Sequence, residues 1–461
     1  MFKRIHNKLG DFWWYSLMLF FACRAADVLN AFVGLWLVPK YVDPSELGAV
    51  MPLTQFANFL AIPIASFANT FRNELTRLSI GREFGKLRTL MRGVFVATAV
   101  FLFIAIIVAR FLLPAFLERI RIVEGSLGLV IIAASFIGAV APIYSNAMQA
   151  LKKFKAQSIL SIIGAPVRLL TMLAAMPFRA ITGYFVGQAS IPIFGITASI
   201  FSLRKELSAS AEPYWNKGTF KKFAVLFFLF FLTAISCGFL GLVESTVIRQ
   251  HLPDLDSASY YMATRFSEIG TYLYGAIVFV FFPFAAELAR RSKDHAMLIL
   301  KAAGVNIAFC LTMSAVFFLV SKPILAVLPH GDMYAAYWWA IPWLIAITGI
   351  SSLHGFYTTA EIATGRFGFL WWNIPLDFTY TALLIVITGH GYFAGIIPSS
   401  WTSFLTTHNI HSLYTMLLWM TTITIIKAFA CLIAMATEKR RWEFRHNGMM
   451  ILKTKNQSTT L

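Results

Sequence analysis

Charged residues are scarce in this sequence. They occupy 13% of its 461 positions, whereas a soluble protein carries about 25%. Hydrophobic residues occupy 58%, against about 45–50% in a soluble protein. This balance excludes an ordinary soluble domain. A membrane-spanning helix needs about 20 apolar residues, so the chain has room for ten or more of them.

Cysteines and nucleotide-binding motifs are also sparse. The four cysteines lie inside apolar stretches at positions 23, 237, 310 and 431, which excludes a disulfide framework and predicts no metal site. His408 and His411 are three residues apart but have no third ligand nearby. No glycine-rich loop ends in Gly-Lys-Ser/Thr, so we expect no ATP hydrolysis by the chain. We predict no cofactor and no enzymatic activity.

Acidic residues are fewer than basic ones. The 39 Lys and Arg against 21 Asp and Glu give a formal charge of +18. In a soluble protein this excess would suggest nucleic-acid binding. In a membrane protein, basic residues collect in the cytoplasmic loops and set the orientation. We therefore predict no nucleic-acid partner.

Apolar runs of about 20 residues predict twelve membrane-spanning helices. The runs cover residues 12–38, 48–70, 93–113, 127–148, 158–176, 183–203, 223–247, 260–286, 296–320, 337–360, 369–388 and 412–436. With the N-terminus inside, Lys and Arg favour the inner side by about four to one. The sequence therefore predicts that both termini are cytoplasmic and that the first helix is not cleaved as a signal peptide.

A short internal repeat predicts two similar halves. Glu74–Arg77 (ELTR) follows the second run, and Glu287–Arg290 (ELAR) follows the eighth. Six predicted spans separate the copies, so both halves have the same orientation, as in parallel-repeat transporters. We predict an all-α membrane protein with two six-helix lobes. The predicted segments are an N-terminal lobe (1–203), a cytoplasmic linker (204–222), a C-terminal lobe (223–436) and a basic cytoplasmic tail (437–461).

Ionisable and amide side chains inside the predicted spans are the candidates for function, because inserting one charge costs about 2.5–3.5 kcal/mol. In several spans they repeat at spacings that share one helix face. The candidates are Arg24 and Asp27 in the first span, Gln55 and Asn58 in the second, Arg168 in the fifth, Arg265 and Glu268 in the eighth, His354 and Glu361 in the tenth, Asp377 in the eleventh, and Lys427 in the twelfth.

These side chains predict a hydrated cavity between the two bundles. The predicted substrate-binding residues, suited to an anion, are Arg24, Arg168, Arg265, Asn58 and Gln55. The predicted ion- or proton-coupling residues are Asp27, Glu268, Asp377, His354 and Glu361. Of the carboxylates, we expect Asp377 to bind a proton, because its own helix carries no other charge.

A structural explanation stays open for two of the arginines. Arg24 with Asp27, and Arg265 with Glu268, are three residues apart and could simply neutralise each other within their helices. Arg168 has no acid in its own helix, so this explanation does not extend to it.

Two segments resemble polysaccharide exporters and O-antigen flippase-like proteins of the multidrug/oligosaccharidyl-lipid/polysaccharide (MOP) superfamily. Leu37–Gly48 (LVPKYVDPSELG), between the first two spans, is similar to the family's junction, in which a turn with Pro and an acid precedes a Gly. The eighth span, from Tyr260–Arg265 (YYMATR) to Phe282-Pro283 and Glu287-Leu288, resembles the counterpart in the second half.

The resemblance implies two six-helix lobes in a V around a central, often cationic cavity. It also implies alternating access that carries a polyprenyl-diphosphate-linked sugar to the outer leaflet without ATP, commonly with ion coupling. The long outer segment 389–411 departs from the short loop 177–181 of the first half, and we predict a lid or docking element there.

The sequence is therefore interpreted as a flippase for lipid-linked oligosaccharide in a bacterial cytoplasmic membrane. The expected partners are a lipid-linked anionic oligosaccharide, membrane lipid, a polysaccharide polymerase and glycosyltransferases. One alternative is an ion-coupled exporter of drugs or metabolites from the same superfamily, and another is a purely structural subunit. A third is a membrane glycosyltransferase, ligase or polymerase, for which Glu244, Asp254 and Asp256 are the candidate carboxylates.

Overall fold

The computed structural model describes residues 25–457 except 123–124, 152, 209, 291–295, 365 and 389–411. Arg24, the histidines at 408 and 411, and the predicted lid at 389–411 therefore lie outside the described residues. Throughout the described residues the regular elements are helices, with no strand. The predicted all-α fold class is confirmed.

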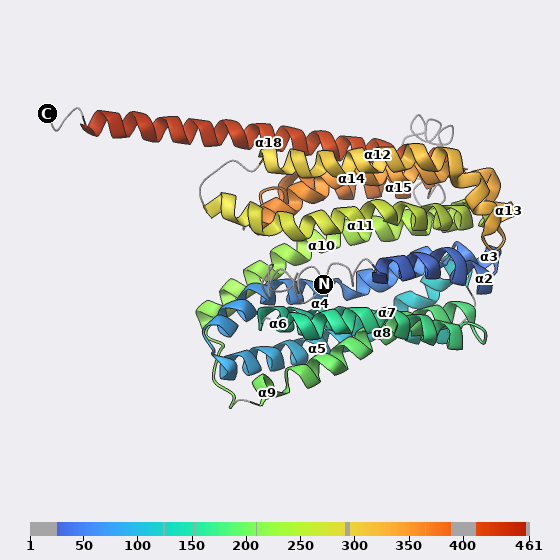
Figure 1. The fold of residues 1–461 in the computed structure, drawn as a ribbon, viewed down its shortest axis with the longest axis horizontal. Helices are drawn as coiled ribbons and strands as arrows, with labels where there is room; N and C mark the ends of the chain where they lie inside the picture. The colour runs from blue at the N-terminus through green and yellow to red at the C-terminus, as the bar shows by residue number, and fades with distance from the viewer. Residues whose placement is uncertain are drawn as a thin grey trace, which may run out of the picture. The chain divides into compact units, whose positions relative to one another are not determined.

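The helices of the first half begin with helical residues 25–32, which continue into a π-helical turn, η1. The elements that follow are shown in Figure 1. They are η1 (Val33–Leu37), α2 (Val38–Tyr41), α3 (Pro44–Leu47), α4 (Val50–Ile80), α5 (Phe84–Arg119), α6 (Gly125–Ala150), α7 (Phe154–Ala175), α8 (Ala180–Ser202) and α9 (Arg204–Leu207).

The remaining helices include the longest ones. They are α10 (Lys217–His251), α11 (Asp254–Arg290), α12 (Ala296–Val327), α13 (Gly331–Tyr334), η2 (Ala335–Tyr337), α14 (Ala340–Ala363), α15 (Leu370–Thr388) and α18 (Leu413–Gln457). Helix α18 continues through most of the segment predicted as a basic tail. Every predicted apolar run from 48–70 onward coincides with a helix.

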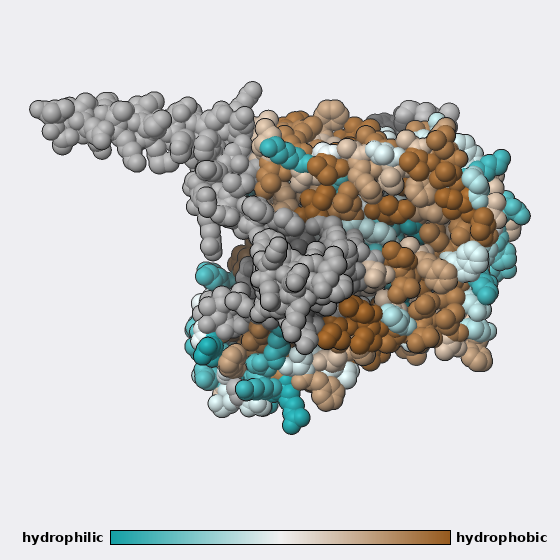
Figure 2. All heavy atoms as spheres, viewed as in Figure 1, coloured by the Kyte–Doolittle hydropathy of each residue, from teal (hydrophilic) through white to brown (hydrophobic). Residues whose placement is uncertain are grey.

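Eight of the described helices are long and apolar enough to cross a membrane. Helices α7, α11 and α15, which also contain predicted spans, are not among them. On the apolar helices, large hydrophobic side chains face outward: Phe103 and Phe111 of α5 are 67% and 76% exposed. Figure 2 shows such hydrophobic side chains over much of the visible surface. A helix that is apolar on its exposed face is typical of a protein surrounded by lipid.

The junction Leu37–Gly48 forms a short capped helix. The Asp43 carboxylate accepts hydrogen bonds from the Ser45 backbone N–H (2.8 Å) and hydroxyl (2.6 Å), and these bonds lower the pKa of Asp43. Pro44 occupies the first helical position, where its missing N–H is harmless. At Gly48, a Cβ would lie 2.5 Å from the Ser257 Cβ on α11. The motif therefore combines a helix cap with a close helix contact.

The chain divides into two compact units. The first comprises the described parts of Met1–Arg265, Ile324–Ala336 and Thr381–Leu413, and the second those of Phe266–Pro323, Tyr337–Tyr380 and Tyr414–Leu461. In the first unit, α4 packs against α6 and α10, and α8 packs against α6 and α7. In the second unit, the glycines at 270 and 349 lie close to Cys310 on α12. The lobe boundaries at 203 and 223 stay a prediction.

Candidate functional site

Arg168 is the predicted site residue with the most informative surroundings. It lies on α7 and is 7% exposed. Its Nη1 donates a hydrogen bond to the Gln188 Oε1 on α8 (3.3 Å), and the Gln188 Nε2 donates to the Tyr184 hydroxyl (2.9 Å). The Gln188 amide therefore orients the guanidinium from α8 and connects it to the Tyr184 hydroxyl.

Gln188 also lines a polar cavity of about 590 Å³ between α6, α7 and α8. Hydroxyl and amide side chains on all three helices contribute to its wall, among them Ser145, Asn146, Gln157 and Ser199. The Gln157 Nε2 donates to the Ser145 hydroxyl (3.0 Å), whereas its buried Oε1 has no hydrogen-bond partner in the described part of the chain. The cavity wall therefore holds a buried acceptor that a ligand can satisfy.

Two prolines add backbone acceptors to the same wall. Pro142 lies inside α6 and Pro192 inside α8, and both line the cavity. A helical proline cannot donate to the carbonyl four residues earlier. The carbonyls freed in this way belong to Gly138 and Gln188, which also line the cavity. Neutral donors and acceptors in this number suit a ligand rich in hydroxyl groups.

The predicted amides of the second span lie elsewhere. Gln55 is half-buried on α4, and its Oε1 lies 3.4 Å from where a Cβ on Gly241 of α10 would be. Asn58 is exposed one turn further along α4. Neither residue lines the cavity between α6, α7 and α8. The structure therefore does not group them with Arg168.

Arg265 on α11 packs against the helix that carries Asp27. A Cβ on Gly34 would lie 2.8 Å from the Arg265 Cδ, and the Tyr261 hydroxyl donates to the Gly34 carbonyl (3.2 Å). The Arg265 guanidinium carbon lies 4.9 Å from the centroid of the Tyr261 ring, a cation–π contact. The absence of a side chain at Gly34 makes room for this arginine. Asp27 itself is half-buried.

In the second unit, four polar side chains form a chain across three helices. His354 Nε2 on α14 shares a hydrogen bond with the Asn373 Oδ1 on α15 (2.8 Å). The Asn373 Nδ2 donates to the Asp377 Oδ2 (3.0 Å), and the Lys427 Nζ on α18 forms an ion pair with the other oxygen of Asp377. We call these four residues the polar relay. Asp377 is 1% exposed and Asn373 also 1%.

The polar relay changes the interpretation of Asp377. Its own helix holds no other charge, but the structure supplies a cation from α18. Asn373 was not among the predicted residues, although its spacing of four from Asp377 places both on one helix face. Glu361 is 1% exposed on α14, two turns from His354. On α11, Glu268 accepts from the Tyr272 hydroxyl (3.4 Å).

Two of the three carboxylates considered for an enzyme, Asp254 and Asp256, hold helix ends together. The Asp254 Oδ1 accepts from Arg249 Nη1 (2.8 Å) and Arg121 Nη1 (3.0 Å). The Asp256 Oδ2 accepts from the Leu413 backbone N–H at the start of α18 (3.1 Å). Both carboxylates therefore have contacts that explain their positions without catalysis.

No known protein-family pattern and no curated protein sequence matches this chain. Solved structures do match it. An inward-facing multidrug resistance transporter of the MATE family, in the MOP superfamily, has a TM-score of 0.67 and 11% identity, with 91% of this chain and 95% of that chain covered. The lipid II flippase MurJ in an inward closed conformation has a TM-score of 0.58 and 15% identity, covering 91% and 87%.

A MOP superfamily transporter from Pyrococcus furiosus, described as having a binding pocket of reverse polarity, gives a TM-score of 0.60 at 10% identity, with 92% and 94% covered. These similarities extend over nearly the whole of each chain. At this level of identity they establish the fold, which is that of MOP superfamily transporters.

Proposed function

We propose that this protein is a membrane transporter that flips a polyprenyl-diphosphate-linked oligosaccharide across a bacterial cytoplasmic membrane by alternating access. The observation that carries the proposal is the buried Arg168, joined through Gln188 to the cavity of amides, hydroxyls and freed carbonyls. The fold supports a transporter, since MATE transporters and a lipid flippase share it. Both termini are cytoplasmic in this proposal.

The chemistry of the cavity suits both parts of such a head group. A diphosphate-sugar cannot cross hydrocarbon unaided, and fixed donors replace the water that it leaves behind. An arginine offers a phosphate two parallel N–H donors, which is stronger and more directional than a single ammonium. The neutral wall around Gln157 and Gln188 would bind sugar hydroxyls. The prenyl chain stays in lipid.

The polar relay is the proposed site of ion or proton coupling. A proton or cation that reaches Asp377 competes with Lys427 for the same carboxylate, and its arrival frees the ammonium. Displacement of Lys427 by a proton or cation would therefore change the contacts between α15 and α18. Asp27, Glu268 and Glu361 remain further candidates, and Arg24 remains a candidate for binding the head group.

A second candidate function is the export of small amphipathic compounds. The similarity to a multidrug resistance transporter favours it. Arg168 opposes it for cationic compounds, because a guanidinium donates its hydrogen bonds to anionic and polar acceptors. Drug susceptibility of a deletion strain distinguishes the two functions. If the protein is a flippase, its deletion should leave susceptibility to cationic drugs unchanged and abolish surface polysaccharide.

The test of the flippase uses variants at Arg168. We expect Arg168→Ala to abolish surface polysaccharide at wild-type protein level, and Arg168→Lys to restore it in part, because lysine supplies charge without the fork. Arg366→Ala, at an exposed arginine between α14 and α15, is the matched control and should be silent. Normal polysaccharide in the Arg168→Ala strain would overturn the proposal.

The test of coupling uses proteoliposomes with an imposed proton or sodium gradient. Wild-type flipping of a fluorescent lipid-linked sugar should respond to one of the gradients. Replacing both charges, as Asp377→Asn with Lys427→Met, should leave flipping at a rate that no gradient changes. A gradient response equal to that of the wild type in this double variant would remove the polar relay from the coupling mechanism.

A further inference from the structure

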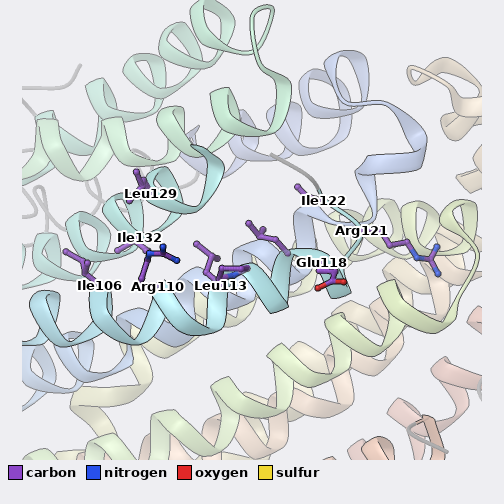
Figure 3. A pocket seen from close by; sticks show the side chains of 10 residues that line it. Ile106, Arg110, Leu113, Glu118, Arg121, Ile122, Leu129 and Ile132 are labelled. Carbon is purple, nitrogen blue, oxygen red and sulfur yellow. The ribbon is translucent and has the colours of Figure 1, made fainter. Parts of the chain in front are cut away.

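A second cavity lies in the first unit, between α5 and α6. Its volume is about 670 Å³. One face of α5 forms one wall, and Leu129 and Ile132 of α6 belong to the other (Figure 3). The residues from α5 lie three or four positions apart, from Ile106 through Arg110 and Leu113 to Leu117, so they share one helix face. We call this cavity the α5–α6 groove.

The two helices that form the groove approach each other closely at Gly128 of α6. A Cβ on Gly128 would lie 2.1 Å from the Leu113 Cδ2, so the missing side chain sets the contact. Elsewhere α5 is covered sparsely, and large apolar side chains such as Phe103 and Phe111 are exposed. Ile106 and Leu129, at the rim, are 44% and 71% exposed. The groove is therefore open to the surroundings of the helices and lined mainly by hydrocarbon.

Arg110 is the available cation of this groove. It is exposed, and within the described residues it has neither an ion pair nor a hydrogen bond from its side chain. Figure 3 shows it on the side of α5 that faces Ile132. Arg121, at the other end of the groove, is engaged: it donates to the Asp254 carboxylate and to the Gln250 carbonyl (both 3.0 Å).

The depth of Arg110 places it near the boundary between head groups and hydrocarbon. The apolar span of α6 begins at Leu127, and Leu113 lies level with Gly128. Arg110 comes three residues before Leu113 on α5, which places it about 4.5 Å deeper in the apolar layer. An arginine at this depth extends its guanidinium toward the interface and keeps its methylene groups in the apolar layer. The charge bias assigns this end of α5 to the outer leaflet.

We propose that the α5–α6 groove binds an anionic phospholipid of the outer leaflet, with its phosphodiester on Arg110 and an acyl chain along the apolar wall. One available guanidinium complements the single charge of a phosphodiester. A diphosphate carries more charge than Arg110 balances, and Glu118 adds an exposed carboxylate about 12 Å further along α5. The charge of the groove therefore favours a phospholipid over the lipid-linked sugar.

The experiment counts lipids on the purified full-length chain by native mass spectrometry, after titration with phosphatidylglycerol or phosphatidylcholine. We expect Arg110→Gln to weaken the tightest phosphatidylglycerol site about tenfold, because a charge-assisted hydrogen bond is lost. Lys322→Gln is the matched control, since it removes one exposed cation from α12. Leu129→Trp tests the groove itself: it fills the space from an exposed position, so it should fold and also release the lipid.

Three results would overturn the proposal. The first is equal phosphatidylglycerol affinity in the wild type and in Arg110→Gln. The second is equal binding of phosphatidylcholine by the wild type. The third is preferential displacement of phosphatidylglycerol by a polyprenyl diphosphate, which would make the transported lipid the occupant. Because the readout is lipid binding, it is independent of flipping and of Arg168.

Discussion

Breaking the ion pair between Asp377 and Lys427 should destabilise the protein strongly. The two side chains are 1% and 14% exposed, so water screens their interaction little. Asp377→Asn leaves the Lys427 ammonium without its anion, and loss of one partner from a buried pair costs about 3–5 kcal/mol. Removing both charges, as Asp377→Asn with Lys427→Met, should recover most of that loss. Replacing both partners of a buried ion pair often leaves stability unchanged.

The assay is reversible unfolding in mixed micelles titrated with sodium dodecyl sulfate. Asp332→Asn, at an exposed carboxylate on α13, is the control for loss of one negative charge and should change the unfolding free energy little. A double-mutant cycle then isolates the coupling energy of the pair. Stability of Asp377→Asn equal to that of the control, or a double variant no more stable than the single one, would refute the reasoning.

Three further predictions concern the first unit and the chain end. Asp43→Ala should lower the unfolding free energy by about 1 kcal/mol through loss of the α3 cap. The pKa of Asp43 is lowered in the folded state, so its contribution to stability should be complete above the unfolded pKa and should disappear as the pH falls through the folded pKa. The difference in unfolding free energy between the wild type and Asp43→Ala should therefore vanish in unfolding curves measured in acid. Gly331→Ala should reduce the folded yield, seen by size-exclusion chromatography, because its Cβ would lie 1.7 Å from the Leu325 carbonyl oxygen. A reporter that works only in the cytoplasm should be active when it is fused after residue 437, because the basic residues there resist translocation. Activity of a reporter that works only outside the cell would contradict the topology.

The helices were predictable from the sequence because hydrocarbon imposes its own rule. Backbone polar groups within a bilayer must find their hydrogen-bond partners inside the protein, and an apolar run of about 20 residues achieves this by itself only as a helix. The runs from 48–70 onward accordingly coincide with helices. The buried state of Arg168 was also foreseeable from its place in an apolar run, and so was the absence of an acid from its helix.

The partners of the polar residues were decided by tertiary structure. Lys427 lies 50 positions from Asp377, and only the packing of α18 against α15 brings the charges together. Asp254, a candidate catalytic carboxylate in the sequence, pairs with Arg121 from the turn after α5. Gln157, whose free acceptor marks the polar cavity, is unremarkable in the sequence.

Apolar periodicity reports only whether a side chain faces hydrocarbon or protein, and it sets the helices one at a time. Which polar groups meet depends on the rotation and register of each helix against its neighbours. Close helix contacts at single glycines constrain this rotation and register, as at Gly34 beside Arg265 and Gly128 beside Leu113. The sequence by itself therefore determined a bundle of membrane-spanning helices. The tertiary structure decided which charges are balanced and which cavities are polar, because electrostatic and hydrogen-bond energies depend on distances between segments far apart in the chain.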